Sequence, residues 1–236
     1  MSVAPLAPGD VQIWHYGLDA DVDRQAQLAL LLDEQERRRA ERFRFEEHRR
    51  RFIVRRGVLR HILACYMRMA PEAICFTNGT SGKPGVDSPA APHALKFSAS
   101  SSQALGAVAL TYDRELGLDL EQVRPDADHE IIAREFSGHE AAGLRHLEPN
   151  KRTAAFFDLW TCKEAYLKGK GLGLSAPLDQ FTIAIDSASP RLTWSALDAT
   201  DPDRWSLYRL NLDPGFAACL AVAGGCQNIR CDRYIW

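Results

Sequence analysis

The stretch Gly117-Leu-Asp-Leu-Glu121, which follows Leu116, alternates leucines with small or acidic residues. Alternation with a period of two is typical of a β-strand that has one apolar face and one polar face. A strand is therefore predicted near 116–121. Asp119 and Glu121 are expected to point the same way, on its polar face.

A second motif further along the chain is Trp160-Thr-Cys-Lys-Glu-Ala-Tyr-Leu-Lys168. Phe156, Trp160, Glu164 and Lys168 recur every four residues, which places them on one stripe of a helix. With the strand pair, Glu164 would make three carboxylates, which repel one another unless a cation lies between them. Oxygen donors without His or Cys beside them suit Mg²⁺ or Mn²⁺. The two motifs together predict a metal-dependent enzyme that acts on phosphate.

Each motif also has a simpler interpretation. Acids on the outer face of a strand are often only solvated, and Glu164 with Lys168 could be a surface pair worth a few tenths of a kcal/mol. The joint arrangement favours a site, because an acid between Trp160 and Phe156 on one helical stripe is an unusual group to leave without a partner.

Length and composition indicate a soluble globular protein. The chain has 236 residues, of which 46% are hydrophobic and 25% charged, enough for one large domain or two small ones. The most apolar segments, near 104–110 and 216–223, are too short to span a bilayer, and no leader-like stretch begins the chain. We therefore expect a cytoplasmic protein without a membrane partner. The cysteines lack CxxC spacing, so neither a disulfide scaffold nor a zinc site is indicated.

The chain has two halves with a similar order of predicted elements. The first half has a strand near 12–17, helices near 24–45 and 48–69, and strands near 73–77, 94–98 and 104–111. The second has a strand near 116–121, helices near 128–147 and 151–169, and strands near 180–186, 191–196, 205–211 and 216–223. No residue-level repeat accompanies this order, so it suggests a topological duplication joined at Tyr112-Asp-Arg-Glu115. If the halves pack face to face, the cleft between them is the natural ligand site.

Basic residues cluster in the first half, where arginine recurs through residues 37–60. This run could bind a polyanion or form the solvated face of an amphipathic helix. The net charge of −2 and the absence of a recognisable nucleic-acid-binding motif disfavour nucleic acid as a ligand. They favour a local pocket that binds phosphate.

Two loops could contribute to such a pocket. Thr77-Asn-Gly-Thr-Ser-Gly-Lys-Pro84 is not a P-loop, because Thr77 and Pro84 stand where Gly and Ser or Thr are needed. Its Gly82-Lys83-Pro84 turn would hold Lys83 at the rim of a cleft or simply in solvent. The hydroxyls of Ser98 and Ser100–Ser102 could donate to phosphate oxygens or form a turn.

The two motifs resemble a known family. Gly117-Leu-Asp-Leu-Glu121 followed by Pro125, and Phe157-Asp-Leu-Trp-Thr-Cys-Lys-Glu-Ala-Tyr-Leu-Lys-Gly-Lys-Gly171, are similar to the paired signatures of the 4′-phosphopantetheinyl transferases of the long, surfactin-synthetase-activating (Sfp) type. Phe136-Ser-Gly-His-Glu140 between them and the Gly82-Lys83-Pro84 turn extend the resemblance over most of the chain. The spaced pair of signatures is specific, whereas either alone is weak.

The resemblance implies an enzyme that transfers the 4′-phosphopantetheine group of coenzyme A to a serine of an apo acyl or peptidyl carrier protein. The reaction would depend on Mg²⁺ and release adenosine 3′,5′-bisphosphate. The implied fold is an α+β pseudo-dimer of two similar α/β halves with the active site in the cleft between them. Residues 1–112 would supply coenzyme A contacts, and residues 113–236 the metal and catalytic residues. The implied partners are coenzyme A and a carrier protein, without nucleic acid or membrane, and the implied state is a monomer.

The resemblance also implies roles for single residues. Asp119, Glu121 and Glu164 would hold Mg²⁺ or Mn²⁺, with Glu164 also the general base, directly or through water. Lys168 would contact the phosphate. Arg51, Lys83 and Ser98, and less strongly Arg44, would hold the nucleotide end of coenzyme A. A carrier could dock around Arg134, Phe136, Arg145 and Lys151, unless these form a solvated helix face.

This sequence departs from the family at one position of the serine strand. Lys96-Phe-Ser-Ala-Ser100 has Ala99 where the family usually has a histidine that helps to bind phosphate. Two hypotheses of other classes remain beside the transferase: a non-catalytic nucleotide or polyanion binder that uses the arginine run, and a metal-dependent phosphohydrolase.

Overall fold

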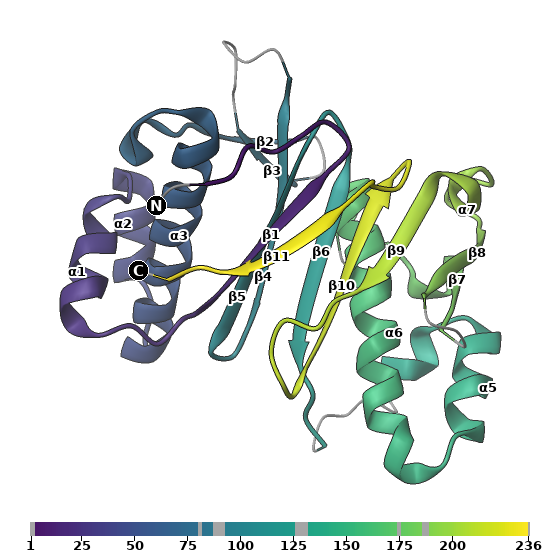
Figure 1. Cartoon of the computed structure of the whole chain (residues 1–236). Helices are drawn as coiled ribbons and strands as arrows, with labels where there is room; N and C mark the ends of the chain where they lie inside the picture. The colour runs from purple at the N-terminus through teal and green to yellow at the C-terminus, as the bar shows by residue number, and fades with distance from the viewer. Residues whose placement is uncertain are drawn as a thin grey trace.

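The computed structural model of this protein describes residues 3–79, 82–86, 93–125, 132–173, 176–185 and 189–235. Two β-sheets lie at its centre, with helices on both outer sides (Figure 1). The helices on one side are α1 (Val22–Leu30), α2 (Glu34–Glu41) and α3 (Glu46–Met67). On the other side lie α5 (Gly138–His146) and α6 (Pro149–Lys170); the short α7 (Asp201–Arg204) lies on this side too, at the top of the view.

The first sheet has the strand order β11-β1-β5-β4, and the second has the order β6-β10-β9. The strands of the first sheet are β1 (Val11–Gly17), β4 (Leu95–Ser102), β5 (Leu105–Tyr112) and β11 (Ile229–Arg233). Those of the second are β6 (Leu116–Gln122), β9 (Trp205–Arg209) and β10 (Phe216–Ala223). Two small pairs complete the strands, β2 (Phe76–Asn78) with β3 (Pro84–Val86), and β7 (Phe181–Ala184) with β8 (Arg191–Ser195). All pairings are antiparallel except that of β1 with β11.

The two halves share an order of elements. Each begins with a strand, continues through helices that end in a long one, forms a two-stranded pair, and returns with two sheet strands. The orders β1-β5-β4 and β6-β10-β9 correspond strand by strand. The mixed helix and sheet content confirms the expected α+β class.

The core is divided among three layers of apolar contact. One lies between α1–α3 and the first sheet, where Val54 and Val58 pack near Leu110. A second lies between the two sheets and contains the leucines of β6 (Leu116, Leu118, Leu120) with residues of β1, β5 and β10. A third joins α6 to β10 and its neighbours. The leucine face of β6 is thus buried against the first sheet, which leaves its other face for α6.

The crossing of β6 over α6 is unusually close. A Cβ placed on Gly117 would lie 1.9 Å from the carbonyl oxygen of Ala165 and 2.3 Å from the amide nitrogen of Gly169. A Cβ on Gly169 would in turn lie 2.5 Å from the Trp205 ring. Only hydrogen fits at these two positions, so the strand and the helix can touch backbone to backbone. This contact brings the polar face of β6 onto the middle of α6.

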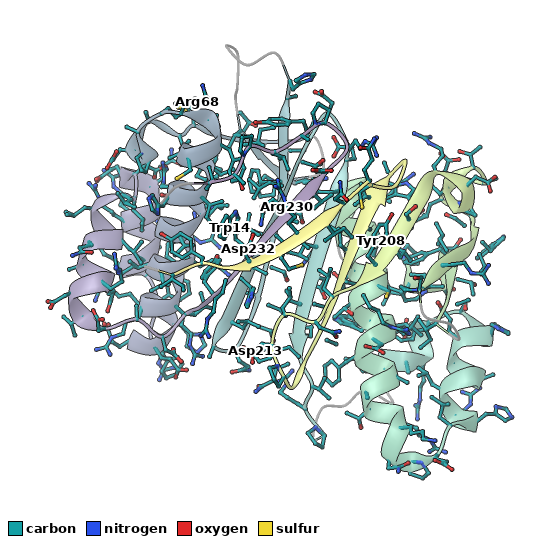
Figure 2. All side chains as sticks on the ribbon, viewed as in Figure 1. Trp14, Arg68, Tyr208, Asp213, Arg230 and Asp232 are labelled. Atoms are coloured by element: carbon teal, nitrogen blue, oxygen red, sulfur yellow. The ribbon has the colours of Figure 1, made fainter. Side chains whose placement is uncertain are left out.

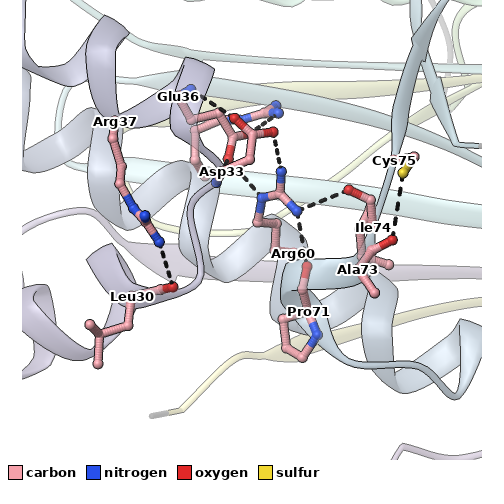
Figure 3. A network of polar contacts seen from close by, with 10 residues as sticks. Leu30, Asp33, Glu36, Arg37, Arg60, Pro71, Ala73, Ile74 and Cys75 are labelled. Carbon is pink, nitrogen blue, oxygen red and sulfur yellow. Dashed lines mark hydrogen bonds and ion pairs between the residues drawn. The ribbon is translucent and has the colours of Figure 1, made fainter.

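Buried charge ties the N-terminal helices together (Figure 3). Arg60 of α3 is fully buried and donates to the Glu36 carboxylate at 2.7 Å and to the Asp33 carboxylate at 2.5 Å. It also donates to the carbonyls of Pro71 and Ile74 at 2.9 and 3.0 Å. At least this arginine of the basic run is structural, because all its charge is neutralised inside the protein.

Two of the predicted helices differ from the structure. The helix expected near 24–45 is two helices, because Asp33 and Glu36 form a capping box that starts α2 afresh. The helix expected near 128–147 is interrupted: Ile132 is helical, Ala133–Glu135 form a 3₁₀ turn, and α5 starts afresh at Gly138, where Ser137 and Glu140 form a second capping box. The part of that prediction on 128–131 lies outside the described residues.

Some strands were misplaced or missed. The strand expected near 73–77 begins at Phe76, after a 3₁₀ turn at Pro71–Ala73. Strands β3 and β11 were not predicted. β11 runs parallel to β1, with Asp232 opposite Trp14, and Figure 2 shows Arg230 and Asp232 beside Trp14 at the middle of the molecule. The end of the chain therefore joins the sheet of the first half. Within the described part, no helix has the length and apolarity that crossing a membrane requires.

Candidate active site

Two of the three predicted ligand carboxylates are buried where β6 crosses α6. Asp119 is 3% exposed and Glu164 is 5% exposed, while Glu121 is half-buried further along β6. The simpler interpretation as solvated surface acids is therefore wrong for Asp119 and Glu164. Asp119 lies two residues beyond Gly117, on the same face of β6, and Glu164 directly precedes Ala165. The close crossing of β6 and α6 therefore positions both carboxylates.

Lys168 connects this acidic centre to the serine strand β4. Its Nζ lies 2.6 Å from Asp119 Oδ1 and 3.0 Å from Ser100 Oγ. The Ser100 hydroxyl itself donates to Asp119 Oδ1 at 3.0 Å, and the Ser102 hydroxyl donates to Glu121 Oε2 at 2.6 Å. Lys168 thus pairs with a strand acid and not merely along its own helix, so α6, β6 and β4 meet at one point.

Two carboxylates of the site each have one oxygen that is not hydrogen-bonded to the described residues. These oxygens are Asp119 Oδ2 and Glu164 Oε1, and both are buried. Burial raises the pKa of Glu164 to about 7, and the neighbouring Asp119 carboxylate adds to the rise while Lys168 opposes it. Burial likewise raises the pKa of Glu121, against the hydrogen bond from Ser102. A buried carboxylate oxygen without a partner is costly, so these two oxygens suit a proton or a cation.

The structure does not itself assemble a complete metal cage. Among the residues it describes, no group of three or more His, Cys, Asp or Glu side chains is arranged to hold a metal ion. Of the predicted metal ligands, Asp119 and Glu164 have free buried oxygens, whereas Glu121 is hydrogen-bonded to Ser102.

The serines of β4 also hold β4 against β6 beside the site. The Ser98 hydroxyl accepts the backbone N–H of Leu118 at 2.9 Å, and the Ser102 hydroxyl accepts that of Gln122 at 3.1 Å. Successive even-numbered serines therefore link β4 to β6, the neighbouring edge strands of the two sheets. Ser98 is buried by this contact but still lines the pocket described next.

A pocket of about 450 Å³ lies beside the acidic centre. Its walls come from α2, α3, β4, the Gly82-Lys83-Pro84 turn and the end of α6, so both halves contribute. Among the residues that the structure describes, five basic side chains and no acidic one line it: Arg39, Arg55, Arg56, Lys83 and Lys168. Asp119 and Glu164 are not among its lining residues, but Lys168 and Ser100, which contact Asp119, are. A ligand with several negative charges matches this surface.

The four predicted coenzyme A residues lie in different surroundings. Lys83 lines the pocket, but its Nζ already has three acceptors: Glu115 at 2.8 Å and the carbonyls of Leu116 and Gly169 at 3.0 Å. Arg51 lines a second hollow of about 420 Å³ and pairs with Asp19 and Glu47. Arg44 is exposed, lines neither hollow, and has its guanidinium 5.5 Å from the Phe45 ring centre. Ser98 lies in the pocket wall, as described above.

The predicted docking residues are only partly at a surface. Arg134 and Arg145 line a hollow of about 290 Å³ between α5 and α6, whose floor includes Leu144 and Phe156. Phe136 is 3% exposed and stacks on Phe156, so it belongs to the core and not to a docking face.

Some pocket residues were not singled out from the sequence. Arg39, Arg55 and Arg56 were noted only as members of the arginine run, and Ser100 only as one hydroxyl of its row. Their helical spacing gave no way to tell arginines that face a pocket from those that face solvent. Only the packing of α3 against β4 separates them.

Comparison with known proteins finds two family matches along the chain. Residues 115–221 match the family described as "4'-phosphopantetheinyl transferase superfamily". Residues 21–111 match the family described as "4'-phosphopantetheinyl transferase, N-terminal".

Curated relatives carry the same description over nearly the whole chain. The 4'-phosphopantetheinyl transferase HetI of Nostoc sp. is 39% identical over 220 residues, which span 93% of this chain and 90% of that protein. The 4'-phosphopantetheinyl transferase psf-1 of Bacillus pumilus is 31% identical, over 86% of this chain and 85% of that protein. The 4'-phosphopantetheinyl transferase Sfp of Bacillus subtilis is 27% identical, over 80% and 81%.

Proposed function

The chain belongs to the 4′-phosphopantetheinyl transferase superfamily, and we propose that it transfers the 4′-phosphopantetheine group of coenzyme A to a serine of an apo acyl or peptidyl carrier protein. The observation that carries this proposal is the acidic centre: two buried carboxylates with unused oxygens, bridged by Lys168 to a pocket lined only by basic charge. Adenosine 3′,5′-bisphosphate would be the second product.

Asp119, Glu164 and Glu121 would hold Mg²⁺, or Mn²⁺ in its place. The unpartnered Asp119 Oδ2 and Glu164 Oε1 fit a hard cation, because carboxylate oxygens are the ligands such ions prefer. Glu121 would have to exchange its Ser102 hydrogen bond, or accept that bond on one oxygen and use the other. When bound, the ion would neutralise charge on the diphosphate of coenzyme A.

The chain's own groups suit the remaining chemistry. Without a bound cation, burial raises the pKa of Glu164 to about 7, and in the reaction its carboxylate would accept the proton of the attacking serine hydroxyl, directly or through water. The Lys168 ammonium lies at the junction of acids and pocket, where it can contact a phosphate oxygen whose charge grows as the bond to the leaving bisphosphate breaks. Positioning and charge stabilisation supply most of the rate in such a transfer.

The basic pocket would take the nucleotide end of coenzyme A. Support differs among the four predicted residues. Ser98 and Lys83 line the pocket, Arg51 lines the adjoining second hollow, and Arg44 lies outside both. Ala99 is also part of the pocket wall, so the side chain that the family usually has there is replaced by open space.

The shared order of elements supports a pseudo-dimer of two similar halves, with the active site in the cleft where they meet. We place the division at residues 112 and 113, so that 1–112 supply coenzyme A contacts and 113–236 the metal and catalytic residues. The protein would act as a cytoplasmic monomer, with coenzyme A and a carrier protein as its partners and without nucleic acid or membrane. Arg134 and Arg145 could face the acidic carrier.

The test is intact-mass spectrometry of apo carrier proteins after incubation with this protein and coenzyme A, in Mg²⁺ and in chelator. The proposal expects one added phosphopantetheine arm per carrier in Mg²⁺ and none in chelator. A non-catalytic polyanion binder would leave every carrier unmodified, and its coenzyme A binding would survive Asp119→Ala. A phosphohydrolase would release phosphate from small esters without any carrier.

A further inference from the structure

Arg55 is the one half-buried arginine of the basic pocket for which the described residues offer no carboxylate. Its guanidinium donates to Ser101 Oγ at 3.2 Å and lies 5.6 Å from the Phe52 ring centre. Burial lowers the pKa of this guanidinium; Tyr16 opposes the shift, and the neighbouring Arg56 and Arg39 add to it. The side chain therefore carries an uncompensated positive charge in a partly desolvated place.

The other cations of the pocket are accounted for. Lys168 pairs with Asp119, Lys83 with Glu115, and Arg56 with Glu36. Arg39 has no carboxylate partner in the described structure, but it is exposed and needs none, because water solvates it. It lies 5.4 Å from the Phe52 ring centre, so Arg39 and Arg55 flank the same ring.

Arg55 also stands where two hollows meet. Together with Phe52 and Ser101 it lines both the 450 Å³ pocket and the 420 Å³ hollow that contains Arg51. Ser101 lies two residues beyond Ala99 on β4, hence on the same face of the strand. The Arg55 guanidinium thus reaches the part of the pocket wall where Ala99 offers no polar group.

We propose that Arg55 binds the 3′-phosphate of coenzyme A and makes the pocket select coenzyme A over its 3′-dephosphorylated form. This inference rests on the proposed function for the identity of the ligand. A phosphomonoester carries between one and two negative charges at neutral pH and accepts paired hydrogen bonds from a guanidinium. The 3′-phosphate would supply the negative charge that no described carboxylate supplies to Arg55.

The position of Arg55 decides which phosphate it meets. Coenzyme A has a diphosphate, where the transfer takes place, and a separate phosphate on the ribose. The diphosphate belongs near Asp119 and Glu164, next to Lys168 on α6. Arg55 comes from α3 and contacts the opposite face of β4, since Ser101 alternates with Ser100 and Ser102, whose hydroxyls face the acids. The more remote phosphate is therefore its partner.

The test is titration calorimetry with coenzyme A and with 3′-dephospho-coenzyme A, without carrier. Wild-type protein should bind coenzyme A more tightly. Arg55→Met, which keeps much of the side-chain bulk, should weaken coenzyme A about 10- to 100-fold, as expected for hydrogen bonds to a charged group, and leave the dephosphorylated form unchanged. Arg55→Lys should give an intermediate preference, because it keeps the charge and loses the fork. Arg50→Met is the matched control, an exposed arginine of α3 paired with Glu46, and should change neither affinity.

The inference is overturned if Arg55→Met weakens both ligands equally, or weakens neither. Circular dichroism of each variant separates loss of fold from loss of binding. Because the titration needs neither transfer nor a carrier, its result is independent of the activity. A protein that discriminates through Arg55 yet modifies no carrier would keep this inference and refute the proposed function.

Discussion

Replacing Gly117 by alanine should separate β6 from α6 and disable the acidic centre. The added Cβ would lie 1.9 Å from the Ala165 carbonyl oxygen, where ordinary contact begins at 3.4 Å, so the backbones must part by about 1.5 Å. Neither neighbour is a flexible side chain that could turn away. We expect a loss of about 3 kcal/mol in the free energy of unfolding, at the upper end for overpacking. In a chain of this size that lowers Tm by about 6–12 °C.

The assay is thermal and urea unfolding, combined with the rate of carrier modification. The rate should fall by about 100-fold or more, because a shift of about 1 Å in a reacting group can cost that much. Gly143→Ala is the matched control: this glycine lies inside α5, and a Cβ there would meet nothing within 4 Å. It should stabilise the protein by about 0.5–1 kcal/mol, since alanine favours helix over glycine, and leave the rate unchanged.

The reasoning fails if Gly117→Ala is as stable as wild-type protein and fully active. That result would mean that the contact between β6 and α6 relaxes without cost. It would also mean that the placement of Asp119 relative to Glu164 does not depend on a close crossing.

Three further predictions concern charge. Because the pKa of Glu164 is raised to about 7, ionising it costs stability, so the free energy of unfolding should fall as pH rises from about 4.5 through about 7. Glu164→Gln should remove up to about 3 kcal/mol of that fall in urea titrations at several pH values; an unchanged pH profile would contradict the raised pKa. Lys83→Met should lower the free energy of unfolding by about 1–3 kcal/mol, because three acceptors of the second half lose the donor that the first half supplies, while Lys151→Met, at an exposed pair, should lower it by less than about 0.5 kcal/mol. Equal losses of stability in these two variants would contradict the inference that Lys83 links the two halves. Glu140→Ala should lower the free energy of unfolding by about 3–5 kcal/mol, because it leaves the fully buried Lys163 without its carboxylate. Glu34→Ala, at a surface pair, should hardly change it. Chemical denaturation that ranked the last two equally would refute this.

The elements of the signature motifs were predictable to within about two residues, since their patterns are strong. The strand expected near 116–121 is Leu116–Gln122, the helix near 151–169 is Pro149–Lys170, and the strand near 216–223 is Phe216–Ala223. Each has a long uninterrupted period of two or four, or a continuous apolar run. The same periods predicted that Asp119 and Glu121 share one face of the strand and that Glu164 and Lys168 share one stripe of the helix.

The boundaries that failed had local signals that apolar periodicity does not capture. Asp33 and Glu36, and again Ser137 and Glu140, have the spacing of a capping box, which starts a helix whatever precedes it. These two pairs mark the points at which both predicted helices are divided. Strand β11 had no such signal, because its half-exposed, charged sequence becomes a strand only by pairing with β1.

Part of the site could not be read from the sequence because it depends on long-range packing. Glycine is needed at position 117 because the Ala165 carbonyl of α6, far along the chain, lies where a Cβ would be. The acceptors of Lys83 lie on β6 and α6, so a residue expected to meet a ligand is also a bridge between halves. Arg55 differs from the paired arginines of its helix only in what faces it across the pocket.

The most direct test of the central claim is the single-turnover rate of phosphopantetheine transfer by Glu164→Gln, at saturating coenzyme A, carrier protein and Mg²⁺. Glutamine keeps the size of the side chain but can neither accept the serine proton nor give its full charge to a cation. The account predicts a rate lower by about 100-fold or more, within the range for loss of a general base, with coenzyme A affinity in the absence of metal unchanged. A variant that transfers at the wild-type rate would show that the buried acidic centre is not where the reaction takes place.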